Sequence, residues 1–112
     1  MATKQLLVFS NPTDGKDSEY NDWYDGQHLP DVLAVPGFVG AQRFRIGAPD
    51  ANLPGSNWSY LAIYEIEESS FDAAWLELQA RSASGVVRPS DAINLATTSV
   101  VLASPLGPRV TG

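Results

Sequence analysis

The sequence has 112 residues, of which 44% are hydrophobic and 10% aromatic, so it predicts one small domain with a packed core spanning residues 1–112. Seven Lys and Arg against 13 Asp and Glu give a formal net charge of −6, which argues against nucleic acid or an anionic membrane surface as a partner. The lack of cysteine excludes disulfides and thiolate chemistry, and the lack of an apolar run long enough for a membrane span or a leader predicts a cytoplasmic protein.

The spacing of apolar residues predicts four strands and two helices. In chain order these are a strand over residues 4–10, a helix from 17 to about 27 with a further turn over 31–34, strands over 38–46 and 58–66, a helix from 67 to about 83, and a strand over 97–104. Tyr20, Trp23 and Tyr24 carry the helical spacing of the first helix. The stretch 47–57 holds turn formers and is predicted to be an exposed loop.

This order of elements predicts an α+β, ferredoxin-like domain in which a four-stranded antiparallel sheet carries both helices on one face. In the strand over 38–46, simple alternation places Phe38 and Phe44 on one face and Arg43 and Arg45 on the other. The strand over 58–66 is apolar on both faces, so the face away from the helices also needs cover. A second copy packed sheet to sheet would supply it, which predicts a homodimer.

His28 is the only histidine and the only side chain whose ordinary pKa lies near neutrality. If the first helix continues past Gly26, His28 lies one turn beyond Tyr24 and near Trp23. Such a cluster can stack on a flat ring and move a proton, so His28 and Tyr24 are candidate catalytic residues and Trp23 is a candidate substrate-binding residue. Two alternatives stay open: Asp25-Gly26 is also a typical helix end, and a lone histidine at a helix end is commonly a capping or half-buried residue.

Further candidate substrate-binding residues lie in the predicted second and third strands. Trp58, Tyr60 and Tyr64 are expected on one strand face, where they form either the packing of a core or dimer interface or the wall of a pocket. Arg43 needs an anionic partner if it is buried. Glu65 is the structural alternative to a substrate for that role.

Several cofactor and metal motifs are missing. The sequence has no P-loop, no G-x-G-x-x-G, no G-x-S-x-G and no H-E-x-x-H. One histidine and no tight carboxylate pair give no metal-site pattern. An enzyme with this sequence is therefore expected to use neither cofactor nor metal.

The motif residues of the first helix and second strand resemble a known family. They occupy residues 19–24 (EYNDWY), 28–31 (HLPD), 36–38 (PGF) and 41–44 (AQRF). The chain resembles the dimeric α+β barrel superfamily over about residues 4–104, most closely its EthD-like branch. The resemblance implies a ferredoxin-like protomer that pairs with a second copy to close a barrel, with a cleft between sheet and helices. It also implies His28 as the proton-transfer residue, Tyr24 and Trp23 as its neighbours, and Arg43 as the motif arginine.

Members of this superfamily include cofactor-free isomerases, cyclases, dehydratases and monooxygenases, as well as ligand-sensing domains. We expect a cofactor-independent lyase, isomerase or cyclase that acts on a small cyclic or aromatic metabolite, in catabolic or polyketide-type metabolism. His28, with a pKa near 7, would take the proton, and Tyr24 or Tyr60 would stabilise the substrate oxygen. The alternatives are a cofactor-free monooxygenase of phenolic substrates and a non-enzymatic, ligand-binding accessory dimer of a catabolic oxygenase.

Overall fold

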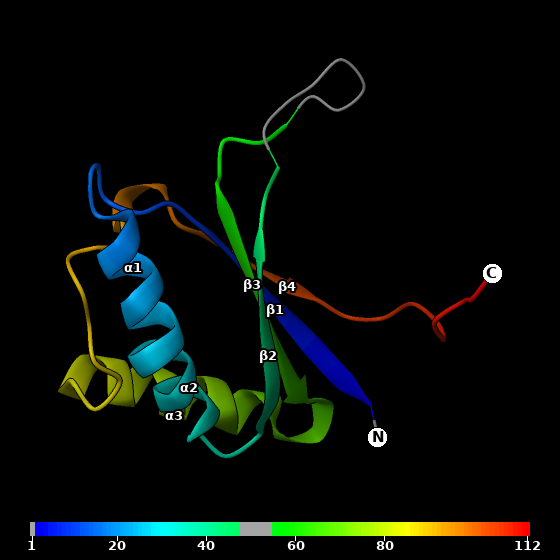
Figure 1. The fold of residues 1–112 in the computed structure, drawn as a ribbon. Coiled ribbons are helices and arrows are strands. Elements are labelled where there is room, and N and C mark those ends of the chain that lie inside the picture. Colours follow the sequence, from blue (N-terminus) through cyan, green and yellow to red (C-terminus); the bar gives the residue numbers. More distant parts are fainter. Residues whose placement is uncertain (1, 48–54) are drawn as a thin grey trace.

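In the computed structural model, which describes residues 2–47 and 55–112, helices cover one face of a four-stranded antiparallel sheet (Figure 1). The elements are β1 (Thr3–Ser10), α1 (Asp17–Trp23), the π-helical turn η1 (Tyr24–His28), α2 (Leu29–Leu33), β2 (Phe38–Arg45), β3 (Tyr60–Glu67), the short 3₁₀ turn η2 (Glu68–Ser70), α3 (Phe71–Ser84), a second 3₁₀ turn η3 (Leu95–Thr97) and β4 (Ser99–Ala103). The strand order β2-β3-β1-β4 is the ferredoxin-like arrangement, so the predicted fold class is confirmed. Of the loop predicted over 47–57, residues 48–54 lie outside the described residues.

A bulge in β2 decides which of its side chains face the helices. The register with β3 shifts between Phe38 and Gly40, so Val39 is an extra residue on β2. As a result Phe38 pairs with Ile66 and Arg43 with Ala62, and all four point to the helix side. The predicted alternation, which separated Phe38 from Arg43, is wrong because one inserted residue reverses the faces of everything beyond it.

Trp58 lies outside β3, which begins at Tyr60 and not at residue 58 as predicted. Its indole packs on Phe9 with ring centroids 5.3 Å apart, and its Nε1 donates to the carbonyl oxygen of Thr97 at 2.7 Å. Phe9 belongs to the face of β1 that the helices leave uncovered. Trp58 therefore does not share a strand face with Tyr60 and Tyr64, which both point to the helices.

The first helical segment runs through Gly26 without a break, from α1 through η1 into α2. In η1 the backbone N–H of Leu29 donates to the carbonyl of Tyr24, five residues back. Pro30, which follows, has no N–H, and in a regular α-helix its ring clashes with the carbonyl four residues before it. A widened turn relieves this clash, which explains why the helix continues past the residues that could have ended it.

The widened turn also keeps the buried residues of both halves on one side of the helix. Tyr20 precedes it, Tyr24 is its first residue, Val32 follows it in α2, and all three are almost completely buried. An α-helix turns by about 100° per residue, so eight regular steps from Tyr24 would rotate Val32 about 80° away from it. With one residue accommodated as a bulge, the difference falls to about 20°. The core pattern and the π-turn therefore require each other.

Helix α3 packs against the start of β2 at close range. Gly37 has φ +100°, and a Cβ at this position would lie 2.9 Å from the Cβ of Ala74. Only glycine fits both the backbone conformation and the space. The helix ends at Gly85, with φ +83°, close to the end predicted near residue 83.

The chain between α3 and β4, residues 86–98, crosses the helix side of the sheet and is called the strap below. Its far end is tied to the segment after β1 by backbone hydrogen bonds. The N–H of Thr13 donates to the carbonyl of Ala92 at 2.7 Å, and the N–H of Asn94 donates to that of Asn11 at 2.9 Å. These bonds fix a segment whose sequence predicts no regular structure.

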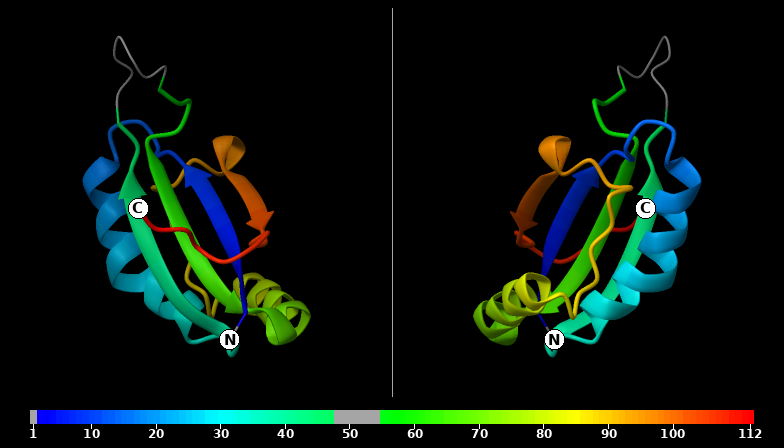
Figure 2. Two further views of the ribbon diagram at one scale, coloured as in Figure 1. Left: turned by 90° about the vertical axis from the view of Figure 1, so that its right-hand side faces the viewer. Right: turned by 90° about the vertical axis from the view of Figure 1, so that its left-hand side faces the viewer.

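No helix covers the other face of the sheet (Figure 2, left). Its apolar residues are Leu7, Phe9, Phe44, Leu61, Ile63 and Val101. The chain after β4 extends away from the domain on this side (Figures 1 and 2). Within residues 2–47 and 55–112, no helix combines the length and apolar composition that a membrane crossing requires.

Candidate functional site

A cavity of about 270 Å³ lies among the sheet, the first helical segment, α3 and the strap. Most of its wall is apolar. The apolar lining residues are Leu6, Val8, Trp23, Val32, Trp75, Leu78, Val87, Pro89, Ile93, Leu95 and Val100. The titratable side chains His28, Tyr24 and Tyr64 interrupt this wall. An apolar cavity with a few convergent polar groups is the usual form of a small-molecule site.

Three aromatic rings meet at the end of the π-turn. The indole of Trp23 stacks on the imidazole of His28 with centroids 4.6 Å apart and planes 27° apart. The phenol of Tyr24 meets the same imidazole edge to face at 5.1 Å and 84°. In a turn closed between residues i and i+5, Trp23 and His28 lie one above the other. The structure thus brings together the three residues that the sequence predicted as a cluster.

His28 and Tyr64 each have a buried polar atom without a hydrogen-bond partner among the described residues. These atoms are Nδ1 of His28 and the hydroxyl oxygen of Tyr64. Buried polar atoms are nearly always paired, and leaving one unpaired costs roughly 1–3 kcal/mol. Both residues line the cavity while these two atoms are themselves covered, so a shift of the side chains would let a ligand supply the missing partners.

Burial determines the protonation state of this cluster. It lowers the pKa of His28 from 6.5 to about 4, with the negative charge of Asp31 acting in the opposite direction. Burial also raises the pKa of Tyr24 to about 12 and that of Tyr64 well above 10. At neutral pH the imidazole is therefore uncharged and both phenols keep their protons. The His28 pKa lies well below the value near 7 at which a general base works best at neutral pH.

These groups can therefore hold and polarise a flat molecule. The aromatic side chains offer faces and edges for stacking, the neutral imidazole can accept a proton, and the phenols can donate hydrogen bonds to an oxygen. Residues 2–47 and 55–112 contain no three His, Cys, Asp or Glu side chains placed to hold a metal ion.

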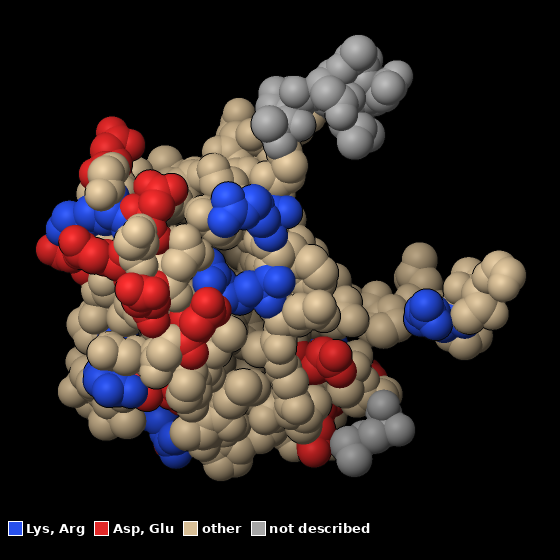
Figure 3. Space-filling model, viewed as in Figure 1, with Lys and Arg blue, Asp and Glu red and all other residues tan. Residues whose placement is uncertain are grey.

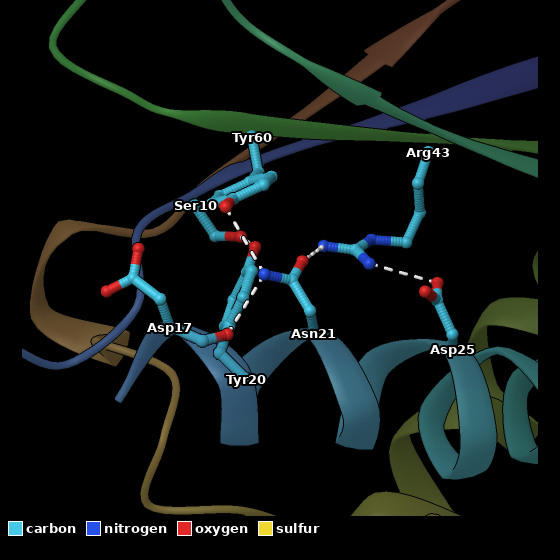
Figure 4. Close-up of polar contacts among 7 residues, drawn as sticks. All are labelled: Ser10, Asp17, Tyr20, Asn21, Asp25, Arg43 and Tyr60. Atoms are coloured by element: carbon cyan, nitrogen blue, oxygen red, sulfur yellow. Dashed lines mark hydrogen bonds and ion pairs between the residues drawn. The ribbon is translucent and has the colours of Figure 1, made fainter. Parts of the chain in front are cut away.

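Arg43 is not among the residues that line the cavity and belongs to a polar network of its own (Figure 4). Its Nη1 donates to Oδ1 of Asp25 at 2.9 Å and its Nη2 donates to Oδ1 of Asn21 at 2.8 Å. The Arg43 guanidinium also lies 4.4–5.4 Å from the ring centroids of Tyr20, Tyr24 and Tyr60. Glu65, the partner suggested by the sequence, lies on the other face of the sheet, because the β2 bulge turns Arg43 towards the helix.

Tyr60 belongs to this network and not to the cavity wall. Its hydroxyl oxygen accepts a hydrogen bond from Nδ2 of Asn21 at 3.2 Å, and the hydroxyl groups of Ser10 and Tyr20 are bonded beside it (Figure 4). Acidic side chains gather over the outer surface of this region (Figure 3). Of the sequence-predicted residues, the structure places His28, Tyr24, Trp23 and Tyr64 around the cavity and Arg43, Trp58 and Tyr60 elsewhere.

Two residues that the sequence did not single out connect the strap to the His28 helix. The carboxylate of Asp31 accepts hydrogen bonds from the backbone N–H of Arg88 at 2.9 Å and from its Nε at 3.0 Å and Nη2 at 2.9 Å. The Nε1 of Trp23 donates to the carbonyl of Arg88 at 3.0 Å. The partners lie far apart in the sequence, so no local pattern could have revealed this contact.

Solved structures show this fold, although no family model and no curated protein matches the sequence. An EthD-like protein from Ralstonia eutropha JMP134 has a TM-score of 0.65 at 16% identity, covering 97% of this chain and 96% of the other. A provisionally assigned monooxygenase from Shewanella loihica PV-4 gives 0.62 at 15%, covering 96% and 97%. A dimeric ferredoxin-like protein of unknown function from Thermobifida fusca YX gives 0.59 at 14%, covering 93% and 92%. The chain therefore has the fold of EthD-like and dimeric ferredoxin-like proteins, as the motif resemblance implied.

Proposed function

We propose that this protein is a cofactor-independent lyase, isomerase or cyclase that binds a small, planar, uncharged ring compound in the His28 cavity and transfers a proton through His28. The observation that carries the proposal is the pair of residues, His28 and Tyr64, that line one apolar cavity and each keep a buried polar atom unpaired. A ligand oxygen or hydroxyl is the partner we propose for these groups.

The size and charge of the cavity support this ligand class. A cavity of about 150 Å³ lined by apolar side chains is known to hold benzene, so about 270 Å³ suits a molecule of one or two rings. Among the described lining residues, Arg88 alone carries a full charge at neutral pH, and its guanidinium is already paired with Asp31. A carboxylate ligand would lose its hydration without gaining a free cation, which favours an uncharged ring.

The proposed chemistry starts from the neutral imidazole. The bond between a ring carbon and its hydrogen breaks, the proton moves to His28, and the electron pair moves onto a neighbouring carbonyl oxygen. The protonated hydroxyls of Tyr64 and Tyr24 would donate hydrogen bonds to that oxygen as it gains charge. The developing negative charge would raise the proton affinity of His28, which is otherwise a weak base with a pKa of about 4.

The first test observes His28 directly. We would label histidine with nitrogen-15, titrate pH by NMR, and repeat the titration with a panel of phenols, lactones and β-diketones. One chemical class is expected to shift the His28 signals and its titration. A compound of that class should then turn over, with His28→Ala losing about 10²–10⁴-fold in rate. Leu76→Ala, at a position that is 66% exposed on α3, serves as the control with unchanged rate.

The same panel separates this proposal from the two alternatives. Oxygen consumption with a phenol would favour a cofactor-free monooxygenase, and the Shewanella loihica protein is provisionally assigned as a monooxygenase. Binding without turnover by any compound would favour an accessory ligand-binding protein. Full turnover by His28→Ala would end the proton-transfer proposal.

We also propose that the protein is a homodimer formed through the uncovered face of the sheet. This face carries Ile63 and Leu7 side by side, and an apolar sheet face of this kind gains stability when it is covered. The Thermobifida fusca protein of similar fold is described as dimeric. Light scattering should give twice the chain mass of 12.0 kDa. Ile63→Glu should give monomers, whereas Leu76→Glu on α3 should leave the mass unchanged.

A further inference from the structure

We propose that Arg88 and Asp31 are positioning residues that hold the strap over the cavity and against Trp23, and so control access to His28. This inference rests on the proposed function, in which His28 is the working group of the cavity. Neither residue contributes to that proposal through its own chemistry: each acts through the strap and through Trp23.

The hydrogen bonds of Arg88 join the strap to the helical segment that carries His28. The contacts of Arg88 with Asp31 and Trp23 are called the latch below. Asp31 binds both the backbone N–H and the guanidinium of Arg88, while Trp23 donates to the Arg88 carbonyl. Trp23 and Asp31 flank His28 in the same helical segment, and Trp23 stacks on its imidazole. Arg88 of the strap is thus bonded to two residues of this segment, one before His28 and one after it.

The strap forms one wall of the cavity, and its two ends are held differently. Val87, Pro89 and Ser90, the neighbours of Arg88, line the cavity. The far end is fixed by backbone hydrogen bonds to residues 11 and 13, and at the near end the N–H of Val87 donates to the carbonyl of Arg81 on α3 at 3.0 Å. Between these anchors, Arg88 is joined to the His28 helix by the side chains of Asp31 and Trp23. The stretch around Arg88 is therefore the part of the strap that moves away from this helix when side-chain contacts are lost.

The latch also affects the charge state of His28. The titratable and charged groups around its imidazole are Asp31 on its own helix, Arg88 on the strap, and the phenols of Tyr24 and Tyr64. Loss of the Arg88 guanidinium would admit water and leave the Asp31 charge without its partner, and both changes raise the His28 pKa. Loss of the Asp31 charge would have two opposing effects on the His28 pKa. The admitted water would raise it, and the loss of the attraction between Asp31 and the imidazolium would lower it.

Two variants with different electrostatic consequences follow from this. Arg88→Met removes the guanidinium at a side chain that is 53% exposed, so little packing is lost. Asp31→Asn breaks the same latch from the other side. Lys16→Met is the matched control, because Lys16 forms a salt bridge of 3.1 Å with Asp91 at the far end of the strap, where backbone bonds remain.

Access is measured without any ligand by the rate at which diethylpyrocarbonate modifies the only histidine, followed by absorbance at pH 7. Arg88→Met and Asp31→Asn are each expected to raise this rate about 5- to 30-fold, the change that follows from losing a contact of this strength in an opening equilibrium. The double variant should raise the rate by less than the product of the two single effects, because both substitutions remove the ion pair between Arg88 and Asp31. NMR titration should show a higher His28 pKa in Arg88→Met and a smaller rise in Asp31→Asn.

A rate in Arg88→Met equal to that of the wild type or of Lys16→Met would overturn the inference. So would single-variant effects that multiply in the double variant, since the two residues would then act separately. Circular dichroism establishes folding, and Asp31→Asn supplies the same test if Arg88→Met does not fold. Modification and pKa need no turnover, so the latch can fail while the proposed reaction stands, or hold while that reaction fails.

Discussion

Tyr24 contacts two groups of polar side chains whose hydrogen bonds are satisfied differently. On one side Arg43 donates to Asp25 and Asn21 and lies against three phenol rings (Figure 4). On the other side His28 and Tyr64 line a cavity and each has a polar atom with no partner among the described residues. In the first arrangement the charged group has hydrogen-bond partners, and in the second two buried polar atoms lack one.

This difference distinguishes a structural cluster from a binding site better than residue type does. The sequence placed Arg43 and His28 in one motif, and both were candidates for contact with a substrate. A side chain whose donors are already occupied has little to offer a ligand without breaking existing bonds. A buried group left unpaired lowers the stability of the free protein, and a ligand can recover that energy.

The largest effect that tests this comparison is acid destabilisation on the His28 side. The pKa of His28 is about 4 in the folded protein and 6.5 in its ordinary state. Between these pH values His28 is therefore protonated in the unfolded chain and neutral in the folded one. Stability should therefore fall as pH drops from 6.5 towards 4 and show no His28 contribution above 6.5. The shift corresponds to about 3 kcal/mol at pH 4.

Urea unfolding at a series of pH values checks this, with His28→Phe as the reference that keeps a ring but cannot titrate. The difference between wild type and His28→Phe should shrink or reverse below pH 6.5, while the titration of Asp31 affects both proteins alike. A difference that does not vary with pH would mean that His28 is not desolvated, and the contrast between the two regions would lose its main support.

On the other side of Tyr24, Arg43→Met should lower the free energy of unfolding by about 2 kcal/mol, because it leaves Asn21 without a donor and removes the cation from three ring faces. The His28 titration should stay as in the wild type. Arg45→Met is the control: Arg45 lies 5.6 Å from the Tyr60 ring but is exposed, and should lose less than about 0.5 kcal/mol. Weaker ligand binding in Arg43→Met, with stability intact, would restore Arg43 as a binding residue.

Local patterns were sufficient for the elements and for the central cluster. Helical spacing brought Trp23, Tyr24 and His28 together, and the order of strands and helices predicted the sheet. Gly26 was ambiguous because propensity alone does not reveal that a π-turn and the burial of Val32 carry the helix past it.

The errors arose where one residue or one distant contact decides the outcome. The extra residue at Val39 reversed the faces of β2, and alternation cannot show a bulge. Trp58 packs on Phe9 because the strand begins after it. Arg88 reaches Asp31 only through the path of the strap, which depends on tertiary contacts that no periodicity encodes.

The smallest effect compares two buried tyrosines, one from each region. The Tyr20 hydroxyl is bonded to Ser10, which is itself 1% exposed, so Tyr20→Phe leaves a buried partner unpaired and should lower stability by about 1 kcal/mol. The Tyr64 hydroxyl has no partner among residues 2–47 and 55–112, so Tyr64→Phe should leave stability unchanged or raise it by up to about 1 kcal/mol. Thermal unfolding of the two variants, side by side, gives the sign of each change in stability.

If Tyr64→Phe also loses affinity for the ligand class found by NMR, stability and binding oppose each other at the Tyr64 hydroxyl, as expected of a site whose polar groups are completed by its ligand. Equal losses of stability in both variants would instead mean that Tyr64 has a partner in solution, and that the two sides of Tyr24 are satisfied alike.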